Sequence, residues 1–164
     1  MSSYRRFLVP GGTYFFTVNL AAQGGRMLTD RIADLRAAYA EVTAEMPFAT
    51  RAIIVLPDHL HAIWSLPDGD ADFPTRWKKI KRGFTVRVGE TRARSLSKEK
   101  KGEAGLWQRR YWERVIRDEA ALQTAQRYVW SNAVKHGYVT RAVDWPYSSL
   151  HREIRAGHVP EWGI

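Results

Sequence analysis

The chain has 164 residues, no cysteine and a formal net charge of +9, from 26 Lys and Arg against 17 Asp and Glu. This length suits one domain with a sizeable core, so residues 1–164 are expected to form a single domain. The lack of cysteine excludes disulfides, thiolate metal sites and cysteine nucleophiles. No apolar run of about 18 residues and no secretory-signal core are present, which predicts a cytoplasmic protein without a membrane partner.

The positive charge is concentrated in one part of the chain. Between Thr75 and Glu103 there are eleven Lys and Arg residues against three Glu. Such an excess favours a polyanionic partner, of which nucleic acid is the commonest in a cytoplasm. Seven tryptophans and seven tyrosines add flat surfaces on which unpaired bases can stack. The alternative is that the aromatics build core and the basic residues form a solvated surface; the size of the charge favours nucleic acid.

Apolar periodicity and turn residues divide the chain into alternating strands and helices. Strands are predicted at 13–20, 48–56, 59–66 and 107–117. Helices are predicted at 30–46, with Thr29 as N-cap, and at 72–88, 119–136 and 149–156. Residues 90–105 are polar and charged, and a mobile loop is expected there. The order βαββαβα predicts an α+β fold, a ferredoxin-like or RRM-like sandwich in which helices pack on an antiparallel sheet.

Two of the five histidines lie one residue apart in the stretch PDHLHAIW. On a strand, His59 and His61 point to the same face. This spacing is compatible with a metal site, and equally with a hydrogen-bonded surface pair. The pair does not choose among the metals that imidazole binds, and a metal site would need further ligands from another element, water or substrate.

The third predicted helix carries a stripe of small and polar residues. At 100° per residue, Ala121, Ala125, Tyr128 and Asn132 fall on one face. The Asn132 carbonyl could complete a site for a hard cation, with Tyr128 one turn away. On these residues alone, the ordinary alternatives are favoured, namely a packed tyrosine and a polar residue near a helix end.

Several motifs together resemble those of a known protein family, and this resemblance singles out the same residues. HLH in PDHLHAIW matches the signature of HUH nucleases, and YVWSNAVKHGYV resembles the tyrosine helix of single-tyrosine transposases, written Y-x-x-x-N-P-V-K-x-G. With YRRFLVPGGTYFFTVNL, WQRRYWERVIRD and DWPYSSLHR, the chain resembles the REP-associated tyrosine transposases from about Tyr4 to Arg152. One departure is Ala133 where the family motif has proline.

The resemblance implies the roles of the site residues. His59, His61 and Asn132 would hold a divalent metal, Mg²⁺ or Mn²⁺, and Tyr128 would be the nucleophile. The implied activity is cleavage and rejoining of single-stranded DNA through a 5′-phosphotyrosine link, on REP-type hairpins, by a cytoplasmic, nucleoid-associated chain that is expected to act as a monomer. No general base stands out; His136 is interpreted as a helix-end residue, and His151 and His158 as surface residues.

DNA binding is assigned to basic and aromatic residues outside this centre. The candidates are Arg5, Arg6, Arg76, Lys78, Lys79, Lys81, Arg82, Arg109 and Arg110 for phosphate contacts, and Trp107 and Trp112, with Tyr111 beside them, for stacking. Two competing readings share part of these features. A non-catalytic RRM-like nucleic-acid-binding module explains the charge and the aromatics, and a metal hydrolase that activates water explains the histidines but has no use for Tyr128.

Overall fold

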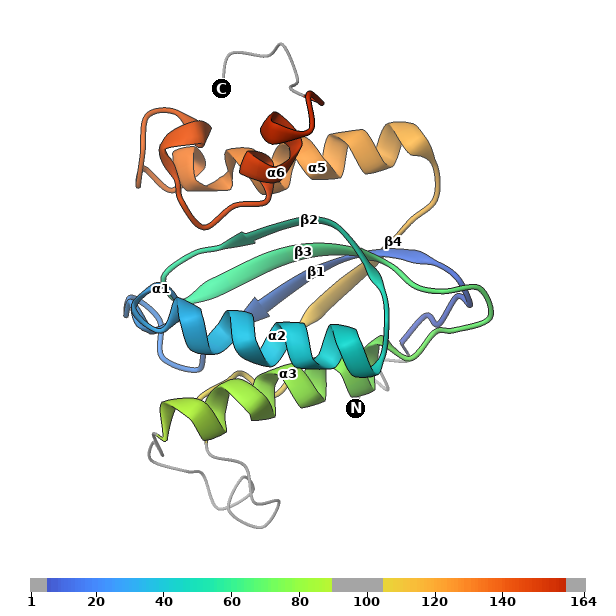
Figure 1. Cartoon of the computed structure of the whole chain (residues 1–164), viewed down its shortest axis with the longest axis horizontal. Coiled ribbons are helices and arrows are strands. Elements are labelled where there is room, and N and C mark those ends of the chain that lie inside the picture. The colour runs from blue at the N-terminus through green and yellow to red at the C-terminus, as the bar shows by residue number, and fades with distance from the viewer. Residues whose placement is uncertain (1–5, 90–104, 159–164) are drawn as a thin grey trace, which may run out of the picture.

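The computed structural model describes residues 6–89 and 105–158. A four-stranded antiparallel sheet lies between two layers of helices (Figure 1). Its strands are β1 (Thr13–Asn19), β2 (Ala49–Val55), β3 (His59–Ser65) and β4 (Trp112–Ile116), in the order β2-β3-β1-β4. The predicted α+β class with helices packed on an antiparallel sheet is confirmed. The helices cover both faces of this sheet, so each face belongs to its own apolar cluster.

One face is covered by α2 (Ile32–Glu45) and α3 (Phe73–Val88), and the short helix α1 (Met27–Asp30) leads into α2. Large aromatic side chains fill this layer, and the rings of Trp64 and Trp77 stack with centroids 4.2 Å apart. The helix α3 begins where the Asp72 carboxylate accepts the Thr75 N–H at 3.0 Å. Such a cap satisfies a backbone donor that has no partner within the helix.

The other face is covered by α5 (Glu119–Lys135), the 3₁₀ turn η1 (Ala142–Asp144) and α6 (Leu150–Arg155). The Asp118 carboxylate caps α5 by accepting the Ala121 N–H at 2.7 Å. The chain leaves the helix through Gly137, whose φ of 74° favours glycine. Val129 and Ala133 of α5 are fully buried in the cluster that includes Phe15 and Ile63 of the sheet.

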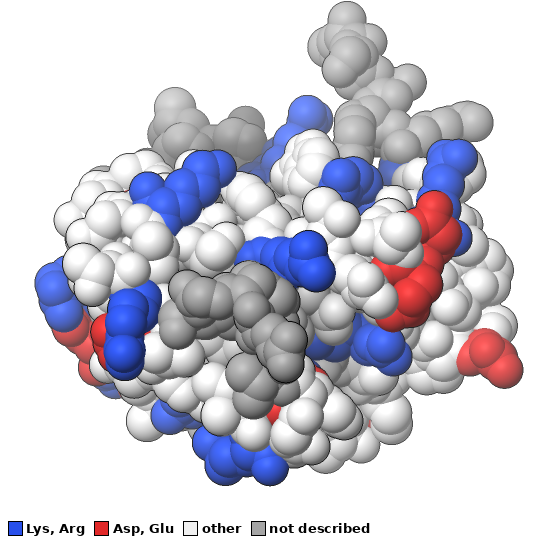
Figure 2. All heavy atoms as spheres, turned by 90° about the horizontal axis from the view of Figure 1, so that it is seen from above, with Lys and Arg blue, Asp and Glu red and all other residues white. Residues whose placement is uncertain are grey.

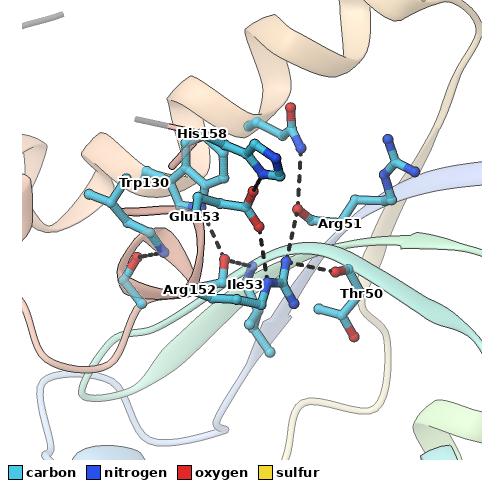
Figure 3. A network of polar contacts seen from close by, with 11 residues as sticks. Thr50, Arg51, Ile53, Trp130, Arg152, Glu153 and His158 are labelled. Carbon is cyan, nitrogen blue, oxygen red and sulfur yellow. Dashed lines mark hydrogen bonds and ion pairs between the residues drawn. The ribbon is translucent and has the colours of Figure 1, made fainter. Parts of the chain in front are cut away.

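Polar contacts hold this helical layer against the edge strand β2, among them the bond that Arg152 of α6 donates to the Thr50 carbonyl at 3.0 Å (Figure 3). The Val55 N–H donates to the Tyr147 carbonyl at 2.9 Å, and Ser148 forms an isolated bridge with Ile54. The Ser149 hydroxyl accepts the Ile53 N–H at 2.9 Å and the Trp130 indole N–H at 3.0 Å. The DWPYSS motif therefore ties α5, α6 and β2 together.

Several predicted boundaries are corrected by the structure. Thr29 is not an N-cap, because it lies inside α1, and the chain bends at Arg31 before α2 begins. The fourth strand begins at Trp112 rather than at 107, where Trp107 makes an isolated bridge with Leu20. The loop expected at 90–105 lies outside the described residues except for Gly105. Within residues 6–89 and 105–158, none of the helices is long and apolar enough to cross a membrane.

Candidate active site

The two histidines of β3 lie on the sheet face that α5 covers. The rings of His59 and His61 have centroids 5.2 Å apart, and the Tyr128 ring of α5 lies 5.5 Å from that of His61. Alternation along β3 places Leu60 in the opposite cluster, under α2 and α3. The strand pair and the tyrosine helix, about 70 residues apart in the chain, thus meet in one place.

Each imidazole is oriented through its Nδ1 atom. His59 Nδ1–H donates to the Asp58 carboxylate at 2.7 Å. His61 Nδ1 lies 2.9 Å from the Thr17 hydroxyl on the neighbouring strand β1. Fixing Nδ1 in this way leaves Nε2 for a ligand, and such hydrogen bonds are typical of histidines that bind metals.

Asp58 is itself held in place. Its second carboxylate oxygen accepts the Gly24 N–H at 2.8 Å, and the residue is 8% exposed. Burial acts to raise the pKa of Asp58, but the bonds from Gly24 and His59 outweigh it and leave the pKa below the ordinary value. Asp58 is therefore ionised at neutral pH, as a strong acceptor for His59 must be.

His61 is electrically neutral at physiological pH. Burial is the main cause that lowers its pKa to about 3, and electrostatic interaction with the nearby imidazoles of His59 and His136 acts in the same direction. The neighbouring Asn132 side chain acts in the opposite direction. The neutral form is the one that binds a metal ion.

Asn132 is fully buried on α5, with 0% of its surface exposed. Its side chain lies close enough to the His61 ring to act on the pKa of that imidazole, but neither its amide oxygen nor its amide nitrogen makes a hydrogen bond of normal geometry to the protein. Buried amides without partners are rare because burial costs them their hydration. Among the described residues, no cluster of three His, Asp or Glu side chains could hold a metal, so an amide oxygen or substrate oxygens would have to complete a site here. The residues present fit a divalent cation of that kind.

Tyr128 stands at the rim of this site and is 40% exposed. Its ring packs edge-on against Phe15, with centroids 5.8 Å apart. The Lys135 ammonium lies 4.8 Å from the ring centroid. The phenol side chain is thus accessible from the solvent and close to a positive charge.

His136 belongs to the site, although its sequence position suggested only a helix end. It is the C-cap residue of α5, and its ring centroid lies 5.2 Å from that of His59. Burial is the first cause that lowers the pKa of His136, followed by electrostatic interaction with the His59 imidazole. His151 bonds to the Trp145 carbonyl and His158 to Glu153, away from this cluster.

Two of the predicted DNA contacts are corrected by the structure. Arg76 is 1% exposed and forms a bidentate pair with Asp70, at 2.7 and 3.1 Å. Its remaining donors bond to backbone carbonyls, so it stabilises the fold and has no surface to offer a phosphate. Trp107 is 7% exposed, packs on Phe84 and donates to the Lys81 carbonyl, so it cannot stack on a base.

The other basic candidates lie mostly away from Tyr128. Lys78 and Arg82 are exposed on α3, across the sheet from the histidines, and Lys79 pairs with Glu45 there. The remaining candidates are Lys81, which bonds to the Gln108 carbonyl, Arg6, which lies over the Tyr111 ring, and the exposed Arg109 and Arg110. Arg5 lies outside the described residues. Trp112 is 52% exposed on the same sheet face as Tyr128.

The face formed by α5 and α6 is rich in basic side chains (Figure 2). Lys and Arg are spread across it, whereas Asp and Glu gather mainly toward one side. A surface of this kind attracts a polyanion over a wide area instead of at a single point.

No protein-family model matches the chain. Two curated proteins match it over 99% of its length. One, from Escherichia coli (strain K12), is a REP-associated tyrosine transposase with 40% identity, and the match covers 91% of that protein. The other, from Haemophilus influenzae, carries the same family name, with 44% identity and 94% coverage. The chain belongs to the REP-associated tyrosine transposase family.

A solved structure agrees with this family assignment. A REP-associated tyrosine transposase bound to a REP hairpin matches all of this chain and 92% of its own, with a TM-score of 0.88 and 40% identity. The family resemblance stated from the sequence is therefore confirmed, and with it the fold.

Proposed function

We propose that this chain is a single-strand DNA endonuclease and strand transferase in which Tyr128 is the nucleophile. The observation that carries the proposal is the meeting of Tyr128 with a neutral His61, an oriented His59 and an unpartnered Asn132 on one sheet face. A non-catalytic binding module has no reason to bury an unsatisfied amide beside two oriented imidazoles.

His59, His61 and Asn132 would hold a divalent cation, Mg²⁺ or Mn²⁺. Imidazole nitrogen together with amide and phosphate oxygen suits such ions. When bound, the ion supplies positive charge that polarises the scissile phosphate and stabilises the transition state. The protein's own part is to keep both Nε2 atoms in position through Asp58 and Thr17.

The reaction exchanges one phosphodiester for another. The Tyr128 phenol loses its proton to the solvent that reaches it, and its oxygen forms a bond to phosphorus. The bond from phosphorus to the 3′ oxygen breaks, and that oxygen takes up a proton. The products are a 5′-phosphotyrosine link and a free 3′-hydroxyl. A second 3′-hydroxyl can reverse the exchange and join strands without ATP.

The substrate would be a single-stranded DNA hairpin of the REP type, because a family member with the same fold is bound to one. The basic residues that would contact its phosphates are Lys78, Lys79, Lys81 and Arg82 on α3, with Arg6, Arg109 and Arg110 elsewhere. Arg5, which lies outside the described residues, stays a candidate for the same role. The residues on α3 can reach only DNA that extends around the sheet. We propose a monomeric, cytoplasmic enzyme that associates with the nucleoid.

The test is a covalent-adduct assay. Labelled single-stranded hairpins from palindromes beside the chain's own coding region are incubated with Mg²⁺ or Mn²⁺ and separated on denaturing gels. The wild-type chain should give a protease-sensitive shifted band that Tyr128→Phe and His59→Ala/His61→Ala do not give. Arg36→Ala, an exposed position on α2, serves as the unaffected control.

Two other outcomes would overturn the proposal. Tight hairpin binding without an adduct in either metal would favour the binding module. Cleavage that survives Tyr128→Phe would make water the nucleophile and remove Tyr128 from its assigned role.

A further inference from the structure

The sheet face that carries the histidines is not evenly covered. The helix α5 packs over β2 and β3, whereas β4 is the strand at the opposite edge of the sheet. On the α5 side of β4, Trp112 is 52% exposed and Arg114 is also exposed. Burying a tryptophan is strongly favourable, so a half-exposed tryptophan on a rigid strand is a candidate binding surface.

The strand register places Trp112 in line with the proposed metal ligands. Thr17 is paired with His61 on one side and with Trp112 on the other. Trp112 therefore lies two strand spacings from His61, roughly 10 Å along one row of the sheet. A nucleotide bound at the histidines would therefore lie beside Trp112.

A continuous set of aromatic contacts joins Trp112 to Tyr128. The Phe15 ring lies 5.8 Å from that of Trp112 and 5.8 Å from that of Tyr128. Phe15 is 4% exposed and fixed in the core. It supports both exposed rings from below, so that each keeps a defined position on the surface.

Arg114 gives this surface a positive charge. Its guanidinium lies 5.7 Å from the Phe15 ring centroid and 6.0 Å from that of Trp112. A flat ring beside a guanidinium suits a nucleotide, because the base stacks on the ring and the phosphate pairs with the cation.

We propose that Trp112 and Arg114 form a stacking platform for one unpaired base of the DNA strand, in the nucleotide next to the phosphate that Tyr128 attacks. The location relative to the cleaved bond rests on the proposed function. The occupant is single-stranded DNA, because a base stacked inside a duplex presents no free face to the ring.

The experiment measures binding in a Tyr128→Phe background, which removes covalent chemistry. Hairpin oligonucleotides with one abasic nucleotide, moved through the single-stranded positions, are titrated by fluorescence anisotropy. One abasic position should weaken binding about 10-fold. Trp112→Leu, which keeps an apolar side chain but removes the flat ring, should weaken the intact DNA by a similar factor. The same abasic position should then cause no further loss, and Trp112→Phe should retain most of the affinity.

A matched pair tests the guanidinium. Arg114→Ala and Arg36→Ala remove the same charge from exposed positions, but Arg36 lies on α2 across the sheet. Arg114→Ala should weaken binding several-fold and reduce the salt dependence by about one phosphate contact, whereas Arg36→Ala should do neither.

The outcomes separate this proposal from the proposed function. If each abasic position weakens DNA binding equally with and without Trp112→Leu, the platform is refuted. This holds even if the chain that keeps Tyr128 forms the covalent adduct. If no adduct forms but the abasic effect disappears in Trp112→Leu, the platform stands as a base-binding site and the nuclease is refuted.

Discussion

The Asp58 carboxylate joins His59 to a loop that lies far from it in the sequence. One of its oxygens accepts from His59 Nδ1 at 2.7 Å, and the other accepts the Gly24 N–H at 2.8 Å. The orientation of a proposed metal ligand therefore depends on the loop between β1 and α1. Asp58 acts through His59, so we regard it as a positioning residue.

Asp58→Asn should misorient His59, because the amide offers one acceptor oxygen where the carboxylate offers two. We expect Mn²⁺ affinity to fall about 10- to 100-fold, measured by calorimetry. In the metal-free chain, ¹⁵N NMR should show His59 losing the tautomer with hydrogen on Nδ1. Asp68→Asn, the same change at an exposed position, should leave both readings unchanged. An unaltered tautomer with weakened metal binding would contradict the positioning role.

Asn132 should lower the stability of the metal-free protein. Its buried amide makes no hydrogen bond of normal geometry to the protein, so Asn132→Leu, which is similar in shape, should raise the free energy of unfolding by about 1–2 kcal/mol without metal. Mn²⁺ should raise the melting temperature of the wild-type chain, and Asn132→Leu should abolish that increase. Asn132→Asp, which keeps an oxygen ligand, should retain that increase. A destabilised Leu variant would show that the amide has a structural role.

Ser149 should stabilise the attachment of α5 to the sheet. Ser149→Ala leaves the Ile53 N–H and the Trp130 indole N–H without their shared acceptor. The expected loss is about 2 kcal/mol in urea unfolding, since both donors are buried or partly buried. Thr124→Ala removes a hydroxyl from the exposed side of the same helix and should change stability by less than about 0.5 kcal/mol. Equal effects would show that the attachment does not depend on this bond.

The ion pair between Asp70 and Arg76 should make the free energy of unfolding depend on pH in the acidic range. The hydrogen bond from Arg76 is the main cause that holds the pKa of Asp70 below its ordinary value. The stabilisation is therefore complete at a pH above the unfolded value of about 3.9 and is lost as the pH falls through the lower folded value. Asp70→Asn should cost about 2–3 kcal/mol at pH 7, and the difference from wild type should shrink as the pH approaches 2. A constant difference would contradict the assignment.

Local sequence patterns predicted most of the framework and part of the site. The alternation of side chains along a strand predicts that His59 and His61 share one face, and helical spacing predicts that Tyr128 and Asn132 do. Only the family resemblance predicts that this strand and this helix form one site. Asp58 was missed as a partner of His59 because its geometry depends on Gly24, which is distant in the chain. The clustering of His136 with His59 likewise depends on how α5 crosses the sheet.

The errors among the DNA contacts have a similar origin. A basic residue on a helix gives no sign of its exposure, and Arg76 is buried because Asp70 and the carbonyls of Met46 and Pro47 meet it there. The sequence pattern places Trp107 and Trp112 in one predicted strand and predicts stacking for both. The strand begins at Trp112, and the chain before it turns Trp107 into the core under α3.

The proposed nucleophile and the proposed histidine ligands belong to different layers of the fold, so the distance between them depends on how closely α5 rests on the sheet. Two small residues that flank Tyr128 and Asn132 along the helix, Ala125 and Ala133, are 2% and 0% exposed. A larger side chain at either position would push α5 away from the sheet. Reacting atoms tolerate less displacement than a folded core does. Substitutions at Ala125 should therefore abolish the proposed DNA cleavage while the chain stays folded.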